Sequence, residues 1–584
     1  MLKLFKNLTK KEVVYMIISS LLIIFQVALE LKMPDYMSQI TVLVQTEGAN
    51  FSDILTSGAY MLLCAIGSLL SAVFTGYLIA EITSKFSLNT RSKLYKKIIH
   101  LDTDKTKEFK TSSLITRTTN DITQVENLLG FGMQMLIKAP LTAAWAITKI
   151  LNKNIEWSIA TIIAVLILIF TLLNIMLKVL PRFKIVQSLI DKLNGVEREN
   201  LQGIRVVRAF NAEKYSEDKF DKVNNDLTFN QLKNQRLFAI LSPVMYLVMN
   251  GLSLSIYIIG AILISNSLLI DKLTLFSNMV VFYSYAMQVI MSFLMLVMVF
   301  MMLPRAEVSA KRINEVLDAE DKIIEGNIIK GSEVGTVEFK NVSFKYPDAE
   351  EYVLENISFK VNKGETIAFI GSTGSGKSTL INLIPRFYDV TSGEILVDGI
   401  NVKDYQKETL NNIIGYVSQK AIIFSGTVKS NIKFGKSNNK ISEKDILDAA
   451  KIAEAKEFVE KMEDTYNSHI SQGGTNISGG QKQRLSIARA VAKDPEIYIF
   501  DDSFSALDYK TDAVLRHNLK KNKKDATMLI VAQRIGTIMN ADKIMVLDNG
   551  KCVGIGTHKE LLKNCEVYKE IALSQLSKEE LENA

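Results

Sequence analysis

Residues 371–379 read GSTGSGKST and have the composition of a loop that holds phosphate groups. The loop follows the apolar run Thr366–Ile370 and leads into the helix-forming TLINLI, as the G-x-x-x-x-G-K-[ST] pattern requires. Glycines let backbone N–H groups surround phosphate oxygens, and the helix directs its positive end at the same anion. We expect Lys377 to reach the outer phosphates and Ser378 to bind Mg²⁺, although a glycine-rich turn that binds nothing is the alternative. The predicted phosphate ligands are Gly371, Ser372, Thr373, Gly374, Ser375, Gly376, Lys377, Ser378 and Thr379.

A second motif supplies carboxylates. Residues 497–502 read IYIFDD, an apolar run that ends in two aspartates. Asp501 is placed to hold the magnesium shell near the phosphates. An apolar run ending in Asp is a weak signal alone, and its pairing with the phosphate loop makes it strong.

A third motif, ISGGQ at residues 477–481, precedes the helix-forming KQRLSIARA. Ser478 and the amides of Gly479 and Gly480 suit a second anion site at a helix start. Read alone, the motif equally suits a loop that caps a helix.

The chain that positions these motifs has 584 residues, too many for one hydrophobic core. Its 48% hydrophobic content is high for a soluble enzyme and indicates a membrane-embedded part. Three scattered cysteines are too few for a disulfide or zinc framework. Basic residues exceed acidic ones by seven, but they gather in particular loops, so no nucleic-acid partner is expected.

Apolar stretches dominate the first half. Each is long enough to cross a hydrocarbon core of ~30 Å as a helix. Lys138, Pro140 and Lys149 interrupt the third, which makes it the weakest prediction. The six stretches are Val13–Leu31, Tyr60–Ala80, Phe131–Ile150, Trp157–Leu180, Leu237–Ile264 and Phe276–Leu303.

Basic residues are concentrated in two long connections, residues 82–130 and 181–236, whereas the short connection 152–156 has only Lys153. The positive-inside rule therefore places the long connections and both termini in the cytoplasm.

Polar residues within the spans are expensive in lipid and are expected to face other helices or a cavity. We favour hydrogen bonding between helices over contact with cargo for each of Gln26, Lys138, Asn174, Asn250 and Gln288. The last span is rich in methionine, which suits either packing or a promiscuous apolar binding surface.

The composition becomes charged after Pro304, which marks a domain boundary. Beyond residue 335, predicted strands alternate with helices as in an α/β sheet, and the phosphate loop lies where such sheets bind ligands. These strands are 337–339, 366–370, 393–397, 413–417, 497–500, 528–531 and 543–547. We predict a transmembrane domain over 1–310, a linker over 311–334 and a nucleotide-binding domain over 335–584.

In order and spacing, GSTGSGKST, ISGGQKQR, IYIFDD and the SALD turn at 505–508 resemble those of the ATP-binding cassette exporter family, over essentially the whole chain. The resemblance implies a six-helix transmembrane domain followed by an α/β P-loop domain that binds ATP and Mg²⁺, in the cell membrane. It implies that Tyr346 stacks on adenine and that Gln419 touches magnesium. It also implies that loop tips near 113–121 and 210–215 dock on nucleotide-binding domains. Two such domains pair head to tail, so that each nucleotide lies between one phosphate loop and the partner's signature, here Ser478, Gly479, Gly480 and Gln481.

Two positions depart from the family pattern. Asp502 stands where the family has the Glu that polarises water, and Gln533 stands where it has His. An aspartate falls about one methylene short, and Gln cannot become cationic or shuttle a proton. The pattern resembles the degenerate-site subunit of heterodimeric bacterial multidrug-type exporters. We therefore expect slow hydrolysis at this loop and a different partner chain that carries Glu and His.

The leading interpretation is an exporter subunit that moves an amphiphilic or drug-like substrate out of the cell by alternating access. One alternative is a homodimeric lipid or drug exporter with working sites, and a more distant one is an ATP-gated channel or sensor. The cargo itself is not readable from the sequence.

Overall fold

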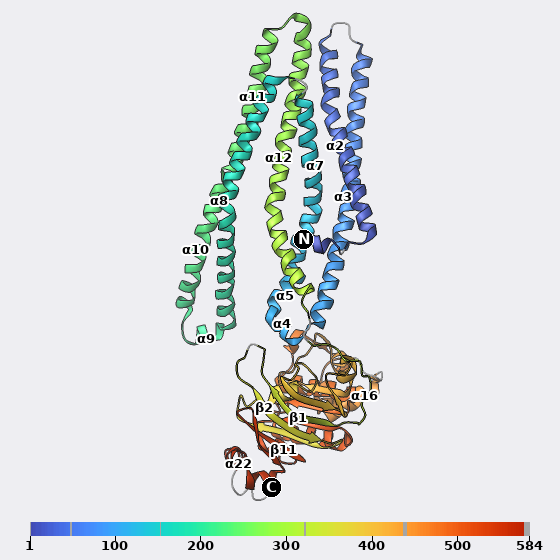
Figure 1. Ribbon diagram of the computed structural model, residues 1–584, viewed down its shortest axis with the longest axis vertical. Coiled ribbons are helices and arrows are strands. Elements are labelled where there is room, and N and C mark those ends of the chain that lie inside the picture. The colour runs from blue at the N-terminus through green and yellow to red at the C-terminus, as the bar shows by residue number, and fades with distance from the viewer. Residues whose placement is uncertain are drawn as a thin grey trace. The chain divides into compact units, whose positions relative to one another are not determined.

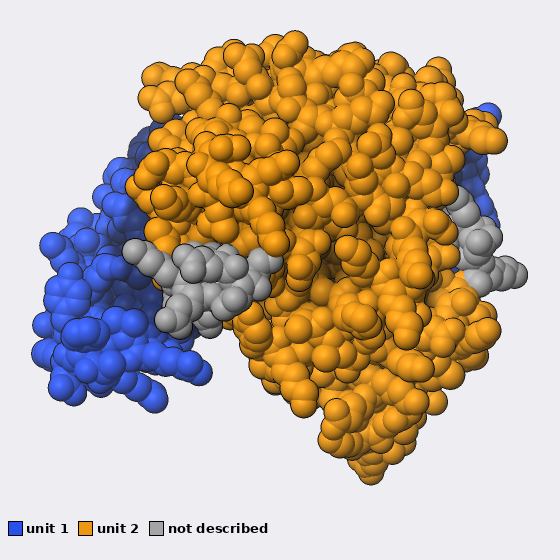
Figure 2. Space-filling view, turned by 90° about the horizontal axis from the view of Figure 1, so that it is seen from below, with its two compact units in different colours: residues 1–100, 109–319 blue, residues 101–108, 320–584 orange. Residues whose placement is uncertain are grey.

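The computed structural model describes residues 2–6, 8–46, 50–151, 154–320, 323–347, 349–435 and 441–576. Lys153 of the short connection and the last residues of the predicted cytoplasmic C-terminus lie outside these ranges. The chain divides into two compact units, residues 1–100 with 109–319 and residues 101–108 with 320–584, which Figure 2 distinguishes by colour.

The first unit is entirely helical (Figure 1). Five of its helical segments are long and apolar enough to cross a membrane. The first of them, α2, begins at a capping box in which Thr9 and Glu12 exchange backbone and side-chain hydrogen bonds. The helices are α1 (Leu2–Phe5), α2 (Lys10–Gln45), α3 (Phe51–His100), α5 (Thr111–Thr118), α6 (Asn120–Asn127), the π-helical η1 (Leu128–Gly132), α7 (Met133–Leu151), α8 (Ile155–Gln202), α9 (Ile204–Ala209), α10 (Glu213–Ala239), α11 (Leu241–Ser265) and α12 (Leu269–Leu317).

The third predicted span coincides with α7, which is not one of the five long apolar segments. Its two lysines form ion pairs with acidic residues of α2. Lys138 Nζ lies 2.9 Å from Glu30, and Lys149 Nζ lies 2.7 Å from Asp35. The charges that weaken α7 as an isolated apolar segment are therefore neutralised by a neighbouring helix.

The polar residues of the spans behave in two ways. Gln26 Nε2 donates to the Glu30 carboxylate over 2.8 Å, so it joins the network that includes Lys138. Asn174 and Asn250 instead donate to the carbonyls of Phe170 and Tyr246, one turn earlier in their own helices. These two amides bond within their own helices by reaching the i−4 carbonyl, and hydrogen bonds between helices stay a prediction for both asparagines.

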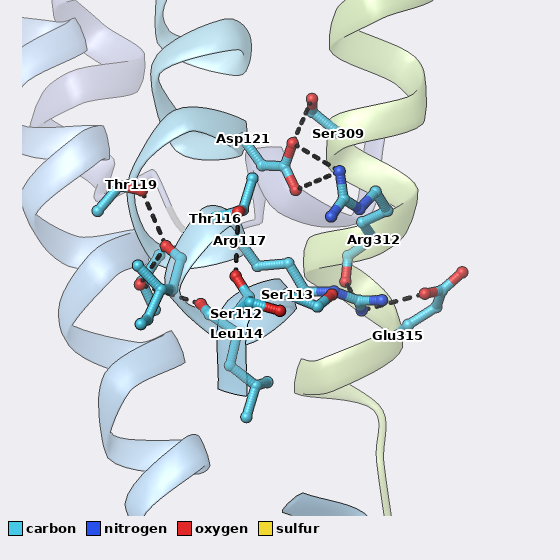
Figure 3. Close-up of polar contacts among 12 residues, drawn as sticks. Ser112, Ser113, Leu114, Thr116, Arg117, Thr119, Asp121, Ser309, Arg312 and Glu315 are labelled. Atoms are coloured by element: carbon cyan, nitrogen blue, oxygen red, sulfur yellow. Dashed lines mark hydrogen bonds and ion pairs between the residues drawn. The ribbon is translucent and has the colours of Figure 1, made fainter. Parts of the chain in front are cut away.

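The segment between α3 and α7 is held against α12 by charged side chains (Figure 3). The Arg117 guanidinium donates to the Arg312 carbonyl over 2.5 Å and lies 3.0 Å from the Glu315 carboxylate. Ser309 Oγ donates to Asp121 over 2.9 Å, and Arg312 pairs with the same carboxylate at 3.4 Å. Arg117 and Asp121 of this segment therefore contact α12 within the first unit. The docking of residues 113–121 on a nucleotide-binding domain stays a prediction.

The second unit is built on three sheets. The largest has the order β12-β11-β3-β10-β9-β6, parallel except for its edge strand β12. An antiparallel sheet has the order β2-β1-β4-β5, and β7 pairs with β8. The strands are β1 (Val337–Phe344), β2 (Leu354–Val361), β3 (Thr366–Gly371), β4 (Ser392–Val397), β5 (Ile400–Asn401), β6 (Ile414–Val417), β7 (Gly426–Thr427), β8 (His469–Ile470), β9 (Ile497–Asp501), β10 (Thr527–Val531), β11 (Lys543–Asp548) and β12 (Lys551–Gly556).

Helices complete the second unit. They are α4 (Thr103–Phe109), α13 (Lys377–Asn382), α14 (Lys407–Ile413), α15 (Val428–Ile432), α16 (Glu443–Ile452), α17 (Lys456–Glu460), the 3-10 helices η2 (Thr465–Asn467) and η3 (Gln472–Gly474), α18 (Gly479–Lys493), α19 (Tyr509–Asn522), α20 (Ile535–Ile538), α21 (His558–Asn564) and α22 (Glu566–Leu573). Phe109, the last residue of α4, falls in the first unit.

Two hydrophobic cores lie on opposite faces of the parallel sheet. Successive side chains of a strand point to opposite faces, and β9 shows the consequence. Ile497 and Ile499 pack in one core, while Tyr498 and Phe500 pack in the other. Burial on both faces explains why this strand is continuously apolar up to its carboxyl end.

Candidate nucleotide-binding site

The phosphate loop joins the carboxyl end of β3 to the start of α13. Gly376 has a φ of 93°, and a Cβ there would meet the Val353 carbonyl at 2.9 Å. At Gly371 a Cβ would lie only 1.9 Å from the Leu547 carbonyl. The conformation and the close approach of β11 both require glycine at these positions.

Lys377 is held over its own loop. Its Nζ donates to the carbonyls of Gly371 and Ser372 over 3.0 and 2.7 Å and to Ser375 Oγ over 3.2 Å. Burial lowers the pKa of Lys377, and the nearby carboxylates of Asp502 and Asp501 oppose that change. An ammonium in this position is ready to exchange neutral carbonyls for phosphate oxygens, which bind a cation more strongly.

Asp501 and Ser378 meet at the end of β9. Ser378 Oγ donates to Asp501 Oδ1 over 2.7 Å. Burial raises the pKa of Asp501, and the bond from Ser378 acts in the opposite direction. No cluster of three His, Cys, Asp or Glu suited to a metal occurs among the described residues. A hydroxyl beside one carboxylate nevertheless fits Mg²⁺, which takes few protein ligands besides substrate phosphates and water.

Asp502, the next residue, receives two side-chain amides. Gln533 Nε2 donates to Asp502 Oδ2 over 2.8 Å, and Gln419 Nε2 donates to the same oxygen over 3.3 Å. The backbone of Asp502 is in the left-handed region, with a φ of 45°. Burial raises the pKa of this carboxyl even though both amides favour its charged form. The predicted catalytic positions are therefore adjacent and in direct contact.

A residue that the sequence analysis missed supports this pair. Gln575 follows α22, and its side-chain amide donates to the Gln533 carbonyl over 2.7 Å. Its oxygen accepts the Ile535 N–H over 2.8 Å. Gln575 thus fixes the backbone on both sides of Arg534, and its separation of 42 residues from Gln533 left no local sequence signal.

Tyr346 lies beside the phosphate loop. Its hydroxyl is 3.0 Å from Thr379 Oγ1, and its ring packs edge-on against Phe344 and Tyr388 at centroid distances of 5.0 and 5.3 Å. The predicted base-stacking residue therefore has a fixed ring orientation next to the predicted phosphate ligands.

The ISGGQ motif begins α18. Ser478 is its N-cap, and the capping box is completed by Gln481, whose side chain accepts the Ser478 N–H over 2.9 Å. Ser478 and Gly479 are exposed. Ser478 and Gln481 hydrogen-bond to each other at this helix start, as residues of a capping box do.

Comparison with known proteins identifies the chain. The profile of the ABC transporter matches residues 354–505, and that of the ABC transporter transmembrane region matches residues 16–303. An ABC transporter ATP-binding protein of Mycobacterium bovis is 39% identical over 88% of this chain and 86% of its own length. The chain belongs to the ABC transporter family. The transporter thus has both family domains in one polypeptide, as an exporter half-transporter does.

Further relatives of the transporter are named for different functions. A putative multidrug export ATP-binding/permease protein of Bacillus subtilis is 32% identical over 84% of the transporter and 83% of that protein. An ATP-dependent lipid A-core flippase of Haemophilus influenzae is 32% identical over 86% of the transporter and 85% of that protein.

A solved bacterial Atm1-family ABC exporter with ATP bound matches the fold of the transporter with a TM-score of 0.82. It is 23% identical in sequence and covers 97% of the transporter and 100% of that chain. The predicted order of a helical transmembrane domain and an α/β nucleotide-binding domain is therefore confirmed.

Proposed function

We propose that this transporter is one subunit of a heterodimeric exporter and that its own phosphate loop captures ATP but cleaves it slowly. The observation that carries the proposal is the contact between Asp502 and Gln533, 2.8 Å long, at the two positions that the hydrolysis of ATP depends on. Capture of MgATP is assigned to the phosphate loop, Tyr346, Gln419 and Asp501.

Slow cleavage follows from the chemistry of this pair. A general base must be free to reach a water molecule and accept its proton. One oxygen of Asp502 already accepts two amide hydrogen bonds, and the side chain is one methylene shorter than Glu. Gln533 donates a neutral hydrogen bond and carries no proton that it can release at neutral pH. Neither feature helps the attack of water on bound ATP.

The exposed start of α18 is the part of the active chemistry that remains intact. Its free amide end and Ser478 suit the γ-phosphate of a nucleotide held by another chain. We therefore assign the catalytic contribution of this subunit to Ser478, Gly479, Gly480 and Gln481, which complete a site whose Glu and His come from the partner.

We assign six transmembrane helices, with α7 as the third, to a domain over 1–310, followed by a linker over 311–334 and a nucleotide-binding domain over 335–584. The helices cross the cell membrane. The nucleotide-binding domain and both termini lie in the cytoplasm. Basic residues in the long connections support this orientation. The cargo is an amphiphilic, drug-like molecule, in keeping with the methionine-rich last span and the relatives named for multidrug export.

The competing function is a homodimeric lipid or drug exporter with two working sites, which the similarity to a lipid flippase favours. The test is the ATPase rate of the purified full-length chain in lipid nanodiscs, measured alone and with the candidate partner subunit. Little turnover alone and rapid turnover of the mixture support the heterodimer. Rapid turnover by the chain alone contradicts it.

A further inference from the structure

The segment of the long connection that belongs to the nucleotide-binding unit, residues 101–108, places a lysine beside the tyrosine assigned to the base. Lys107 of α4 donates through Nζ to the Tyr388 hydroxyl over 2.6 Å. The same ammonium lies 5.3 Å from the centre of the Tyr388 ring and 5.8 Å from the centre of the Tyr346 ring. One cation thus contacts two aromatic rings of the unit.

These two rings orient each other. Tyr346 and Tyr388 are perpendicular, with an interplanar angle of 89°, and Phe344 packs against both. Tyr388 is 7% exposed, so its ring has little freedom to turn. At the far end, the Tyr346 hydroxyl bonds to Thr379 of the phosphate loop. A continuous chain of contacts therefore runs from Lys107 through Tyr388 and Tyr346 to Thr379.

The start of α4 is seated independently of Lys107. The Asp102 carboxylate accepts the Ile323 N–H over 3.0 Å. A cavity of about 190 Å³ separates this segment from the aromatic cluster, lined in part by Asp102, Lys105, Phe344, Pro347 and Tyr388. Beside this cavity, Lys107 of α4 makes direct polar contact with the aromatic cluster through the Tyr388 hydroxyl.

We infer that Lys107 is a positioning residue for base recognition: it holds Tyr388, and through it Tyr346, in the orientation that a nucleotide base stacks on. The inference rests on the proposed role of Tyr346 as the base platform. A ring that is ordered before binding loses less entropy when the base arrives. The hydrogen bond to Tyr388 raises the pKa of Lys107, so the cation is present throughout the physiological range. By thermodynamic reciprocity, base binding in turn stabilises the docking of α4. The cytoplasmic connection therefore responds to the base as well as to the phosphates.

The experiment compares two ligands that differ in the base. ATP and inorganic tripolyphosphate, each with Mg²⁺, are titrated against the full-length chain in nanodiscs. Lys107→Met is expected to weaken ATP binding roughly three- to tenfold, the range of a partly desolvated cation–π contact, and to leave tripolyphosphate binding unchanged. Lys107→Arg retains the contact and binds ATP as the wild type does. Lys105→Met is the matched control, because it removes the same charge from the same helix at a lysine that pairs with Glu108.

Hydrogen exchange of residues 103–109 supplies the second readout. In the wild type, ATP slows this exchange and tripolyphosphate does not, and the difference disappears in Lys107→Met. Unchanged tripolyphosphate binding also shows that the variant is folded. Equal weakening of both ligands, or no effect on either, overturns the inference. Tyr346→Ala distinguishes the role of Tyr346 as the base platform from the role of Lys107. If it leaves ATP affinity intact, the base platform itself is wrong, whereas an effect of Tyr346→Ala without one of Lys107→Met refutes only the role of Lys107.

Discussion

The side-chain amide of Gln533 donates a hydrogen bond of 2.8 Å to the Asp502 carboxylate. The two residues come from the ends of adjacent parallel strands, β9 and β10, so the sheet itself brings them together. Gln575 in turn holds the main chain of Gln533 by donating a hydrogen bond to its carbonyl. Under the proposed function, the two members of this pair lack the reach and the proton that rapid cleavage of ATP requires.

Restoring both groups is expected to restore cleavage. Asp502→Glu combined with Gln533→His lengthens the base and supplies a titratable partner, so hydrolysis at this loop rises by about a hundredfold, the scale of a 1 Å correction in position. Phosphate release by the full-length chain in nanodiscs measures it. Each single substitution is expected to give much less, since the base and its partner act together. No gain in the double variant would show that the slow step lies elsewhere.

Ser478 is expected to contribute to hydrolysis at the nucleotide site of the partner subunit and not to ATP binding at the phosphate loop of its own chain. Ser478→Ala removes a γ-phosphate contact and lowers turnover of the two-subunit complex at least tenfold, while ATP binding by the isolated chain stays normal. The substitution also removes a helix cap, which costs about 1 kcal/mol. Ser442→Ala is the matched control, because Ser442 caps α16 through the same kind of capping box. Equal loss of turnover in both variants would point to a folding effect.

Removing one partner of the ion pair between Glu30 and Lys138 is expected to destabilise the membrane unit more than removing both partners. Lys138→Met leaves Glu30 with the neutral donors Gln26 and Ser68 and lowers stability by about 3 kcal/mol or more. Adding Glu30→Leu removes the unpaired charge and recovers most of the loss. Thermal unfolding of the full-length chain in nanodiscs measures the cycle. Additive losses in the double variant contradict this account, because they mean that the two side chains do not interact.

The nucleotide-binding unit contains a carboxyl group whose titration opposes folding. Asp398 is 2% exposed, and its burial together with the nearby Glu496 raises its pKa from 3.8 to about 6. The native state therefore binds a proton at Asp398 more tightly than the unfolded state does. The stability that protonated Asp398 contributes is present at low pH and is lost as the pH rises through about 6.

Asp398→Asn keeps an acceptor for the Thr336 N–H and removes this titration. The variant is therefore expected to gain stability relative to the wild type as the pH rises from about 4 to 6. Labelling of the buried Cys565 thiol during thermal unfolding follows this unit. Asp542→Asn, at an exposed carboxylate that also accepts a backbone N–H, is the control. A constant difference between Asp398→Asn and the wild type across this range would rule out the assigned titration.

Local patterns in the sequence predicted the site well where one segment carries the chemistry. Residues 371–379 and the run ending at Asp501 lie on the elements expected of them, because a strand followed by a helix is decided by apolar content and glycine placement. Five strands were not predicted: the two-residue strands β5, β7 and β8, and the longer β2 and β12. β2 does show alternating burial that would have indicated it, whereas the glycines of β12 and its edge position hide the pattern.

The remaining features depend on contacts between distant residues. Gln575, the chain of contacts from Lys107 to Tyr346, and the partners of Lys138 and Lys149 come from separate segments, which only the folded chain brings together. The two lysines made α7 the weakest of the predicted spans because their acidic partners on α2 have no signature in the sequence around them.

The central claim, capture of ATP without rapid cleavage at this loop, is tested most directly by the chemical state of the bound nucleotide. The purified full-length chain is loaded with radiolabelled ATP and Mg²⁺, freed of excess nucleotide, and sampled over time for ATP and ADP. The account predicts that the bound nucleotide persists as ATP in the wild type and is converted to ADP in the variant with both Asp502→Glu and Gln533→His. Rapid conversion to ADP by the wild-type chain alone would contradict it.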